Sequence, residues 1–144
     1  MDWSSCQCSI PDREPTEGLL ELTLPVAEAS VPRARRAVRG WAETAGMSSS
    51  ALDDLALAVT EACSNVVLHA YRPQPVPVGA TFLVRAGSCR DRYLVVVLDD
   101  GCGPSYRPGS PGIGGGLDLI AKLTLAFELK DVSGTELLMV FPLI

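Results

Sequence analysis

The spacing of hydrophobic and polar residues along the first half of the chain predicts one strand and two helices. The stretch "LLELTLPV" (19–26) alternates enough to form a strand. The stretch 30–46 starts with a serine and an early proline and ends at a glycine, as helices do. Ser50 and Asp53 give the next helix a start that resembles a capping box, and its apolar residues recur at steps of three or four to about residues 69–71.

The second half of the chain predicts four strands and one short helix. After a proline-rich break, 79–87 and 92–100 are predicted strands joined by a short polar turn. The second of these is apolar on both faces, so we expect it to lie in the centre of a sheet. The stretch 117–124 predicts a short helix, and 125–131 and 135–144 predict a hairpin.

Length and composition fit one domain with a short leader. The chain has 144 residues, of which 47% are hydrophobic and 20% are charged, and this size supports a single core. Residues 1–17 are polar, contain prolines and lack periodicity. We therefore expect a flexible leader over 1–17 and a domain over 18–144.

Charge and cysteine content limit which partners and which cellular compartment we expect for this protein. The formal net charge of −5 gives no broad attraction for nucleic acid or anionic lipid, so neither is an expected partner. No stretch reaches 18 uninterrupted apolar residues, so no membrane span is expected. The five cysteines are scattered, and the first residues lack the pattern of an export signal. These features predict reduced thiols and a cytoplasmic protein.

Two polar features are candidates for chemistry. Glu61, Asn65 and His69 are spaced by four, so they form one stripe along the second helix, although such a stripe is also typical of a solvated surface. The central strand ends in "LDDGCGP", where an aspartate could accept a hydrogen bond from the amino group of adenine but would repel the keto oxygen of guanine. The alternative is a turn capped by Asp99 or Asp100.

The third candidate is a glycine cluster over 112–116, directly before the predicted short helix. The first amides of a helix have no internal partners and point toward any nearby anion, so phosphates fit this place. The cluster lacks the Gly-Lys-Ser/Thr of a P-loop and the Gly-x-Gly-x-x-Gly of a dinucleotide fold. It therefore indicates another kind of nucleotide site.

Four sequence boxes resemble, in this order, those of the histidine-kinase-like ATPases. "EACSNVVLHAY" (61–71) resembles the N-box, "DDGCG" (99–103) the Asp-x-Gly-x-Gly box, "GGGLDLI" (114–120) the Gly-x-Gly-Leu box and "SGTEL" (133–137) the final Gly-Thr box. Brevity and the Glu-Ala-x-x-Asn-x-x-x-His-Ala-Tyr form resemble the anti-sigma factor serine/threonine kinases, over about 19–143. The resemblance implies a Bergerat-type ATP-binding fold, a two-layer α/β sandwich with a mixed, largely antiparallel sheet and helices on one face.

The resemblance assigns catalytic, metal-binding and adenine-binding roles to matching positions. It implies that Glu61 is the general base that takes the proton from an incoming serine hydroxyl. It implies that Asn65 ligates Mg²⁺ through its side-chain oxygen, a hard donor. Asp99 would hold the amino group of adenine, with Gly101 and Gly103 giving room for the ring.

Further positions would hold the phosphates and close the site. Gly114 and Gly116 would let backbone amides meet phosphate oxygens, and Leu117 completes the same box. Thr135 would support the adenine pocket. The segment 104–113 would be the lid over ATP, and its neighbouring glycines would serve both phosphate approach and hinge motion.

The chain departs from the family pattern at two positions. Kinases of this group commonly carry arginine where this chain has Gly115, and a bulky apolar residue where it has Pro104. Both departures weaken phosphate transfer more than nucleotide binding. Arg107 in the lid could supply the missing positive charge, or it could face solvent. For His69, a packing role near the phosphates is expected rather than catalysis.

These expectations combine into one function with two alternatives. The resemblance implies a serine kinase that uses ATP and Mg²⁺, phosphorylates an anti-anti-sigma partner of the STAS type, and sequesters a sigma factor. Homodimers are typical of the group. One alternative is a module that binds ATP and a partner but transfers nothing. The other is an ATPase without a protein substrate.

Overall fold

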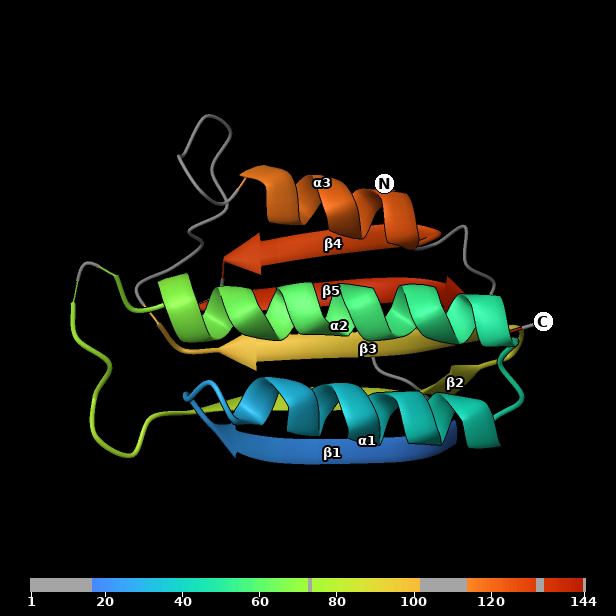
Figure 1. The fold of residues 1–144 in the computed structure, drawn as a ribbon, viewed down its shortest axis with the longest axis horizontal. Coiled ribbons are helices and arrows are strands. Elements are labelled where there is room, and N and C mark those ends of the chain that lie inside the picture. The colour runs from blue at the N-terminus through green and yellow to red at the C-terminus, as the bar shows by residue number, and fades with distance from the viewer. Residues whose placement is uncertain (1–16, 73, 102–113, 132–133, 144) are drawn as a thin grey trace.

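Three helices cover one face of a five-stranded sheet in the part of the chain that the structure describes (Figure 1). The computed structural model describes residues 17–72, 74–101, 114–131 and 134–143. The predicted two-layer α/β sandwich with helices on one face is confirmed. Apart from Glu17, the predicted leader lies outside the described residues.

The sheet has the order β1-β2-β3-β5-β4, and all its described ladders are antiparallel. The sheet was predicted to be mixed and largely antiparallel, but no parallel ladder is found among the described residues. Its strands are β1 (Glu17–Pro25), β2 (Thr81–Cys89), β3 (Arg92–Asp99), β4 (Ala126–Asp131) and β5 (Thr135–Pro142). The apolar run that predicted a central strand forms β3, in the middle of the order. Its residues alternate between the two faces of the sheet, and those from Tyr93 to Val97 are all buried.

The helices are α1 (Ser30–Thr44), α2 (Ser49–His69) and α3 (Gly114–Leu123). α2 lies between the other two and packs against both (Figure 1). No helix within the described ranges is both long and apolar enough to cross a membrane. α3 begins three residues before the predicted 117–124, because the glycines from Gly114 onward already have helical backbone.

The start of α2 differs from the prediction. Ser48, rather than Ser50, is the N-cap residue: its backbone is extended, with ψ of 156°, and its hydroxyl accepts a hydrogen bond from the Ala51 amide at 3.3 Å. Three consecutive serines make the pattern ambiguous, and only the first one leaves the helical conformation.

The main core lies between the helices and the sheet. α2 contributes Leu55, Val59, Ala62 and Val66, all of them buried at helical spacing. Burial of such an aliphatic side chain contributes about 1.5–3 kcal/mol. The apolar stripe therefore fixes the rotation of α2 about its axis and places Asn65 at the border of the core.

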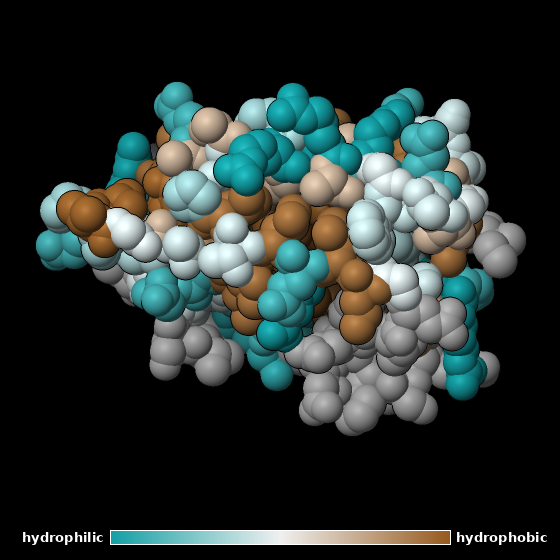
Figure 2. Space-filling view, turned by 90° about the horizontal axis from the view of Figure 1, so that it is seen from below, coloured by the Kyte–Doolittle hydropathy of each residue, from teal (hydrophilic) through white to brown (hydrophobic). Residues whose placement is uncertain are grey.

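The β1 edge of the sheet exposes apolar side chains. Leu19 on β1 is 62% exposed and Trp41 on α1 is 45% exposed. The indole Nε1 of Trp41 donates a hydrogen bond to the Gly18 carbonyl at 2.8 Å, which ties α1 to this strand. Figure 2 views the molecule from this side and shows hydrophobic side chains gathered below a border of hydrophilic ones. An accessible edge strand of this kind is a place where another chain could pair.

Candidate functional site

The segments that carry the predicted boxes meet at one end of the molecule. The C-terminal end of α2, the end of β3, the start of β5 and the start of α3 all lie at this end (Figure 1). Asp99 pairs with Thr135 across the β3-β5 ladder. Gly101 lies against the backbone of Ala70, directly after α2. Predicted site residues that are far apart in the sequence are therefore neighbours in the fold.

Asp99 presents a half-buried carboxylate whose position is fixed by backbone amides. The Gly101 amide donates a hydrogen bond to Asp99 Oδ1 at 3.0 Å, and the Thr135 backbone also hydrogen-bonds to this carboxylate. Burial raises the pKa of Asp99, and the negative charge of Asp100 adds to this, while the two backbone hydrogen bonds oppose it. The side chain is therefore an oriented hydrogen-bond acceptor with remaining lone pairs.

Two glycines allow the backbone to converge around Asp99. Gly134 has φ of +133°, and a Cβ there would overlap the Asp99 carbonyl oxygen. A Cβ on Gly101 would overlap the Ala70 carbonyl oxygen. The absence of a side chain at Gly101 thus allows close packing against the end of α2. The sequence could not indicate this role. Thr135, beside Gly134, is buried.

Several predicted positions lie outside the described residues. These are Gly103 and the predicted lid over 104–113, which includes Pro104 and Arg107. Their predicted roles stay predictions.

Asn65 is the clearest sign of a polar site on α2. The residue is only 7% exposed, and its Nδ2 has no hydrogen-bond partner among the described residues. A buried polar group without a partner costs about 1–3 kcal/mol, so a ligand that satisfied this amide would be favoured. Glu61, one helical turn earlier, is half-buried on the same stripe.

The donor set at this stripe fits Mg²⁺ bound together with a phosphate ligand. The described residues contain no group of three or more His, Cys, Asp or Glu side chains that could hold a metal ion. A cation here would take one oxygen from Asn65 and the others from substrate phosphates and water. Mg²⁺ is commonly bound in that way, because it gives up its water ligands reluctantly.

The end of α2 carries two further polar side chains. Burial lowers the pKa of His69, and the positive charge of Arg72 lowers it further, so both favour the neutral imidazole. The hydroxyl of Tyr71 donates a hydrogen bond to Asp100 Oδ1 at 2.6 Å. Sequence reasoning missed this pair, since its members are 29 residues apart. The only signal was that both residues lie inside the boxes quoted above.

The start of α3 carries the predicted phosphate-binding glycines. α3 begins at Gly114, so Gly116 and Leu117 lie in its first turn. The first amides of a helix lack partners within the helix and carry the positive end of its dipole. This helix end can therefore hold an anion beside α2, against which α3 packs.

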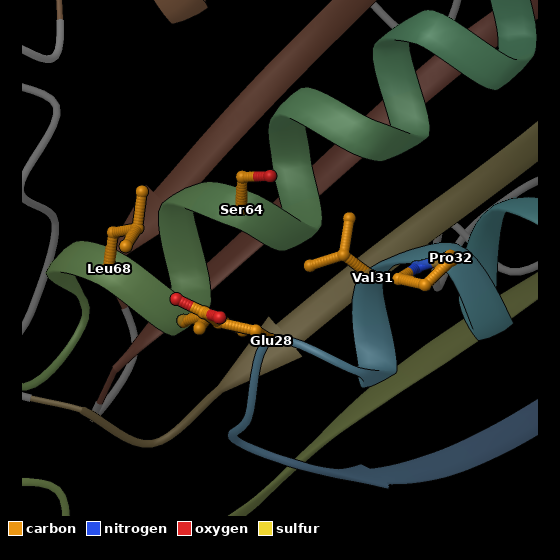
Figure 3. Close-up of a pocket in the computed structure, with 6 residues that line it drawn as sticks. Glu28, Val31, Pro32, Ser64 and Leu68 are labelled. Carbon is orange, nitrogen blue, oxygen red and sulfur yellow. The ribbon is translucent and has the colours of Figure 1, made fainter.

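A cavity of about 330 Å³ lies elsewhere, between α2 and the start of α1 (Figure 3). It is lined by Glu28, Val31, Pro32, Ser64, Val67 and Leu68. The lining is mainly apolar, with the Ser64 hydroxyl and the Glu28 carboxylate as its polar groups. None of the predicted nucleotide-binding residues lines this cavity.

Sequence comparison places these features in a known family. A family model described as "Histidine kinase-like ATPase domain" matches residues 24–141. The serine-protein kinase RsbW of Bacillus licheniformis is 30% identical over 124 residues, which cover 77% of this chain and 76% of the relative. The serine-protein kinase RsbW of Halalkalibacterium halodurans is 31% identical over 135 residues, which cover 83% of this chain and 80% of the relative.

Solved structures share the fold. A crystal structure of the RsbU and RsbW domains of a Mycobacterium tuberculosis protein matches with a TM-score of 0.66 and 22% identity. That match covers 85% of this chain, which spans only 31% of the longer protein. The histidine kinase domain of a blue-light activated kinase from Erythrobacter litoralis matches with a TM-score of 0.52 and 19% identity, over 83% of this chain and 61% of that one. The family model and these relatives show that the chain belongs to the histidine kinase-like ATPase domain family.

Proposed function

We propose that this protein is a cytoplasmic serine-protein kinase that uses Mg²⁺-ATP, phosphorylates an anti-anti-sigma partner and sequesters a sigma factor. The observation that carries the proposal is the meeting of Asp99 and Thr135 with the C-terminal end of α2, the helix that carries the Asn65 stripe. Relatives that are 30–31% identical over most of this chain are serine-protein kinases, which supports the same conclusion.

Asp99 would recognise the base. Its carboxylate accepts hydrogen bonds only, so the amino group of adenine suits it and the keto oxygen of guanine does not. The backbone bonds from Gly101 and Thr135 hold the carboxylate in place before any nucleotide arrives. Such preorganisation lowers the cost of ordering the site on binding.

Asn65 and the start of α3 would hold the charged part of ATP. The side-chain oxygen of Asn65 suits Mg²⁺, which when bound would neutralise phosphate charge during transfer. The amides of Gly114 and Gly116, in the first turn of α3, suit phosphate oxygens. Leu117 would pack beside them.

Glu61 would act as the general base. It lies one turn from Asn65 on the stripe that borders the core, and its carboxylate would accept the proton of the incoming serine hydroxyl. The serine oxygen would then take the terminal phosphoryl group as its bond to the β-phosphate oxygen breaks, and ADP would leave. In this arrangement binding and proton transfer depend on different residues, so they can be separated by mutation.

The test is phosphate transfer from labelled ATP to a candidate anti-anti-sigma partner. We expect Glu61→Gln to lower transfer at least about 100-fold, because general-base catalysis contributes that much, while ATP affinity is unchanged. Glu43→Gln, which alters an exposed glutamate of α1, is the matched control and should leave transfer intact. Full transfer by Glu61→Gln would show that another group is the base.

A second candidate is a protein that binds ATP and its partner but transfers no phosphate. Gly115, which stands where kinases of this group commonly carry arginine, favours it. In that case the wild-type protein would bind ATP and retain the partner in a co-purification, and the partner would gain no label. Transfer of label to a serine of the partner would reject this candidate.

A further inference from the structure

Two consecutive residues after α2 contact two consecutive residues after β3. The Tyr71 hydroxyl donates to Asp100 Oδ1 at 2.6 Å, and the Ala70 carbonyl lies against Gly101. We call these four residues the α2-β3 junction. Tyr71 as a residue is 7% exposed, and a short hydrogen bond from a hydroxyl to a carboxylate is stronger than one between neutral groups.

The junction is linked directly to the carboxylate of Asp99. The amide of Gly101 donates to Asp99 Oδ1 at 3.0 Å, so the path of the chain through Asp100 and Gly101 sets where that amide points. Asp100 is exposed, and without Tyr71 its carboxylate would turn to water. The segment after β3 would then have more freedom, and Asp99 would lose a fixed partner.

We propose that Tyr71 is a positioning residue that determines base specificity: by holding Asp100, it orients the Asp99 carboxylate toward the amino group of a 6-aminopurine nucleotide. This inference rests on the proposed function, since it requires Asp99 to contact the base. It goes further by assigning discrimination between amino and keto purines to a residue that need not touch the nucleotide.

The experiment compares the binding of ATP and inosine 5′-triphosphate by calorimetry in the presence of Mg²⁺. The two nucleotides differ at the position that Asp99 would read, an amino group against a keto oxygen. Tyr71→Phe removes one oxygen and keeps the ring. We expect ATP to bind about fivefold more weakly, the equivalent of about 1 kcal/mol, with inosine triphosphate unchanged.

Tyr93→Phe is the matched control. Tyr93 is fully buried in β3, and its hydroxyl has no hydrogen-bond partner within the described part of the chain. Removing the Tyr93 hydroxyl tests the loss of a buried tyrosine hydroxyl from β3, the strand that leads to the junction, without changing a junction residue. We expect the ratio of the two affinities to equal that of the wild type.

Variants of Asp100 provide an independent test, including the case in which Tyr71→Phe does not fold. Asp100→Ala removes the acceptor at an exposed position, so it should reduce the preference for ATP as Tyr71→Phe does. Asp100→Asn keeps an acceptor oxygen but removes the charge, so it should retain most of the preference. Combining Tyr71→Phe with Asp100→Ala should add nothing, because both break the same bond.

The outcomes separate this inference from the proposed function. An unchanged affinity ratio in Tyr71→Phe or Asp100→Ala overturns the inference. So does a loss confined to melting temperature or binding stoichiometry, because a merely structural role would lower the folded fraction and leave the affinity of the folded protein unchanged. If the wild type binds neither nucleotide, the proposed function itself fails.

Discussion

The strand end and the helix stripe of the candidate site are built differently. At the strand end, the carboxylate of Asp99 accepts hydrogen bonds from the backbone of Gly101 and Thr135. On the stripe, the buried Nδ2 of Asn65 has no partner among the described residues. The backbone of the protein therefore holds the carboxylate that would read a base. The Asn65 amide, in contrast, keeps an N–H donor that a phosphate oxygen would satisfy.

The largest effect is expected from adding a methyl group at the strand end. In Gly101→Ala the new Cβ would overlap the Ala70 carbonyl oxygen, which belongs to backbone and cannot move aside cheaply. We expect a loss of about 2–3 kcal/mol in the free energy of unfolding, measured by denaturant titration. ATP affinity should fall with it, because the same amide orients Asp99.

The control for this substitution is Gly40→Ala. Gly40 lies in α1, and a Cβ there would have nothing within 4 Å outside its own helix. Alanine is the better helix former, so this variant should gain about 0.5–1 kcal/mol. Equal stability of Gly101→Ala and the wild type would contradict the close approach between the two segments.

The second prediction concerns the stripe and has two parts of opposite sign. Asn65→Leu replaces the unpartnered amide with an apolar side chain of similar shape, so the nucleotide-free protein should gain about 1 kcal/mol of stability. The same variant loses the oxygen proposed for Mg²⁺. Its ATP affinity should be equal with Mg²⁺ and with a chelator, whereas that of the wild type should fall when Mg²⁺ is removed.

Ser64→Ala is the neighbouring control, because Ser64 precedes Asn65 on α2 and lines the separate cavity. It should keep the Mg²⁺ dependence of the wild type. Retention of that dependence by Asn65→Leu would remove Asn65 from the metal site.

The smallest effect is a pH dependence at the strand end. The pKa of Asp99 is raised in the folded protein above its ordinary value of about 3.9, so the folded state binds the proton more tightly than the unfolded state. Stability therefore falls as pH rises from the unfolded pKa through the folded pKa, and the cost is fully present above it. Asp99→Asn does not ionise and lacks this step. Melting curves recorded at rising pH from about 4 should show an advantage of the variant that grows until the pH passes the folded pKa. A constant difference would contradict the raised pKa.

Local patterns predicted the elements of the fold well. The apolar run over 92–100 predicted the central strand, which is β3, because a strand buried on both faces needs apolar residues at every position. The helical spacing around Val59 likewise predicted α2. The sequence wrongly placed the N-cap of α2 at Ser50. It also predicted too late a start for α3, because glycines disfavour helix and are therefore interpreted as loop.

Contacts between distant segments could not be predicted in the same way. The resemblance implied that Gly101 gives room for the adenine ring, and this stays a prediction. The structure adds a close approach to the Ala70 backbone that the sequence did not suggest. The sequence also left open whether an aspartate after the central strand binds a base or caps a turn, and the Gly101 amide bond to Asp99 Oδ1 is the contact of a turn cap. In the structure Asp99 accepts from backbone amides and Asp100 accepts from Tyr71. Such roles depend on which distant segments pack together, and local sequence patterns do not reveal those contacts.

The most direct test of the account is calorimetric titration of the wild type and Asp99→Ala with ATP and GTP in Mg²⁺. The account predicts that the wild type prefers ATP and that Asp99→Ala binds ATP roughly 10- to 100-fold more weakly, the range expected for loss of a hydrogen bond to a charged group. The variant should keep a cooperative melting transition. Undiminished ATP binding by folded Asp99→Ala would contradict the claim that this carboxylate reads the base.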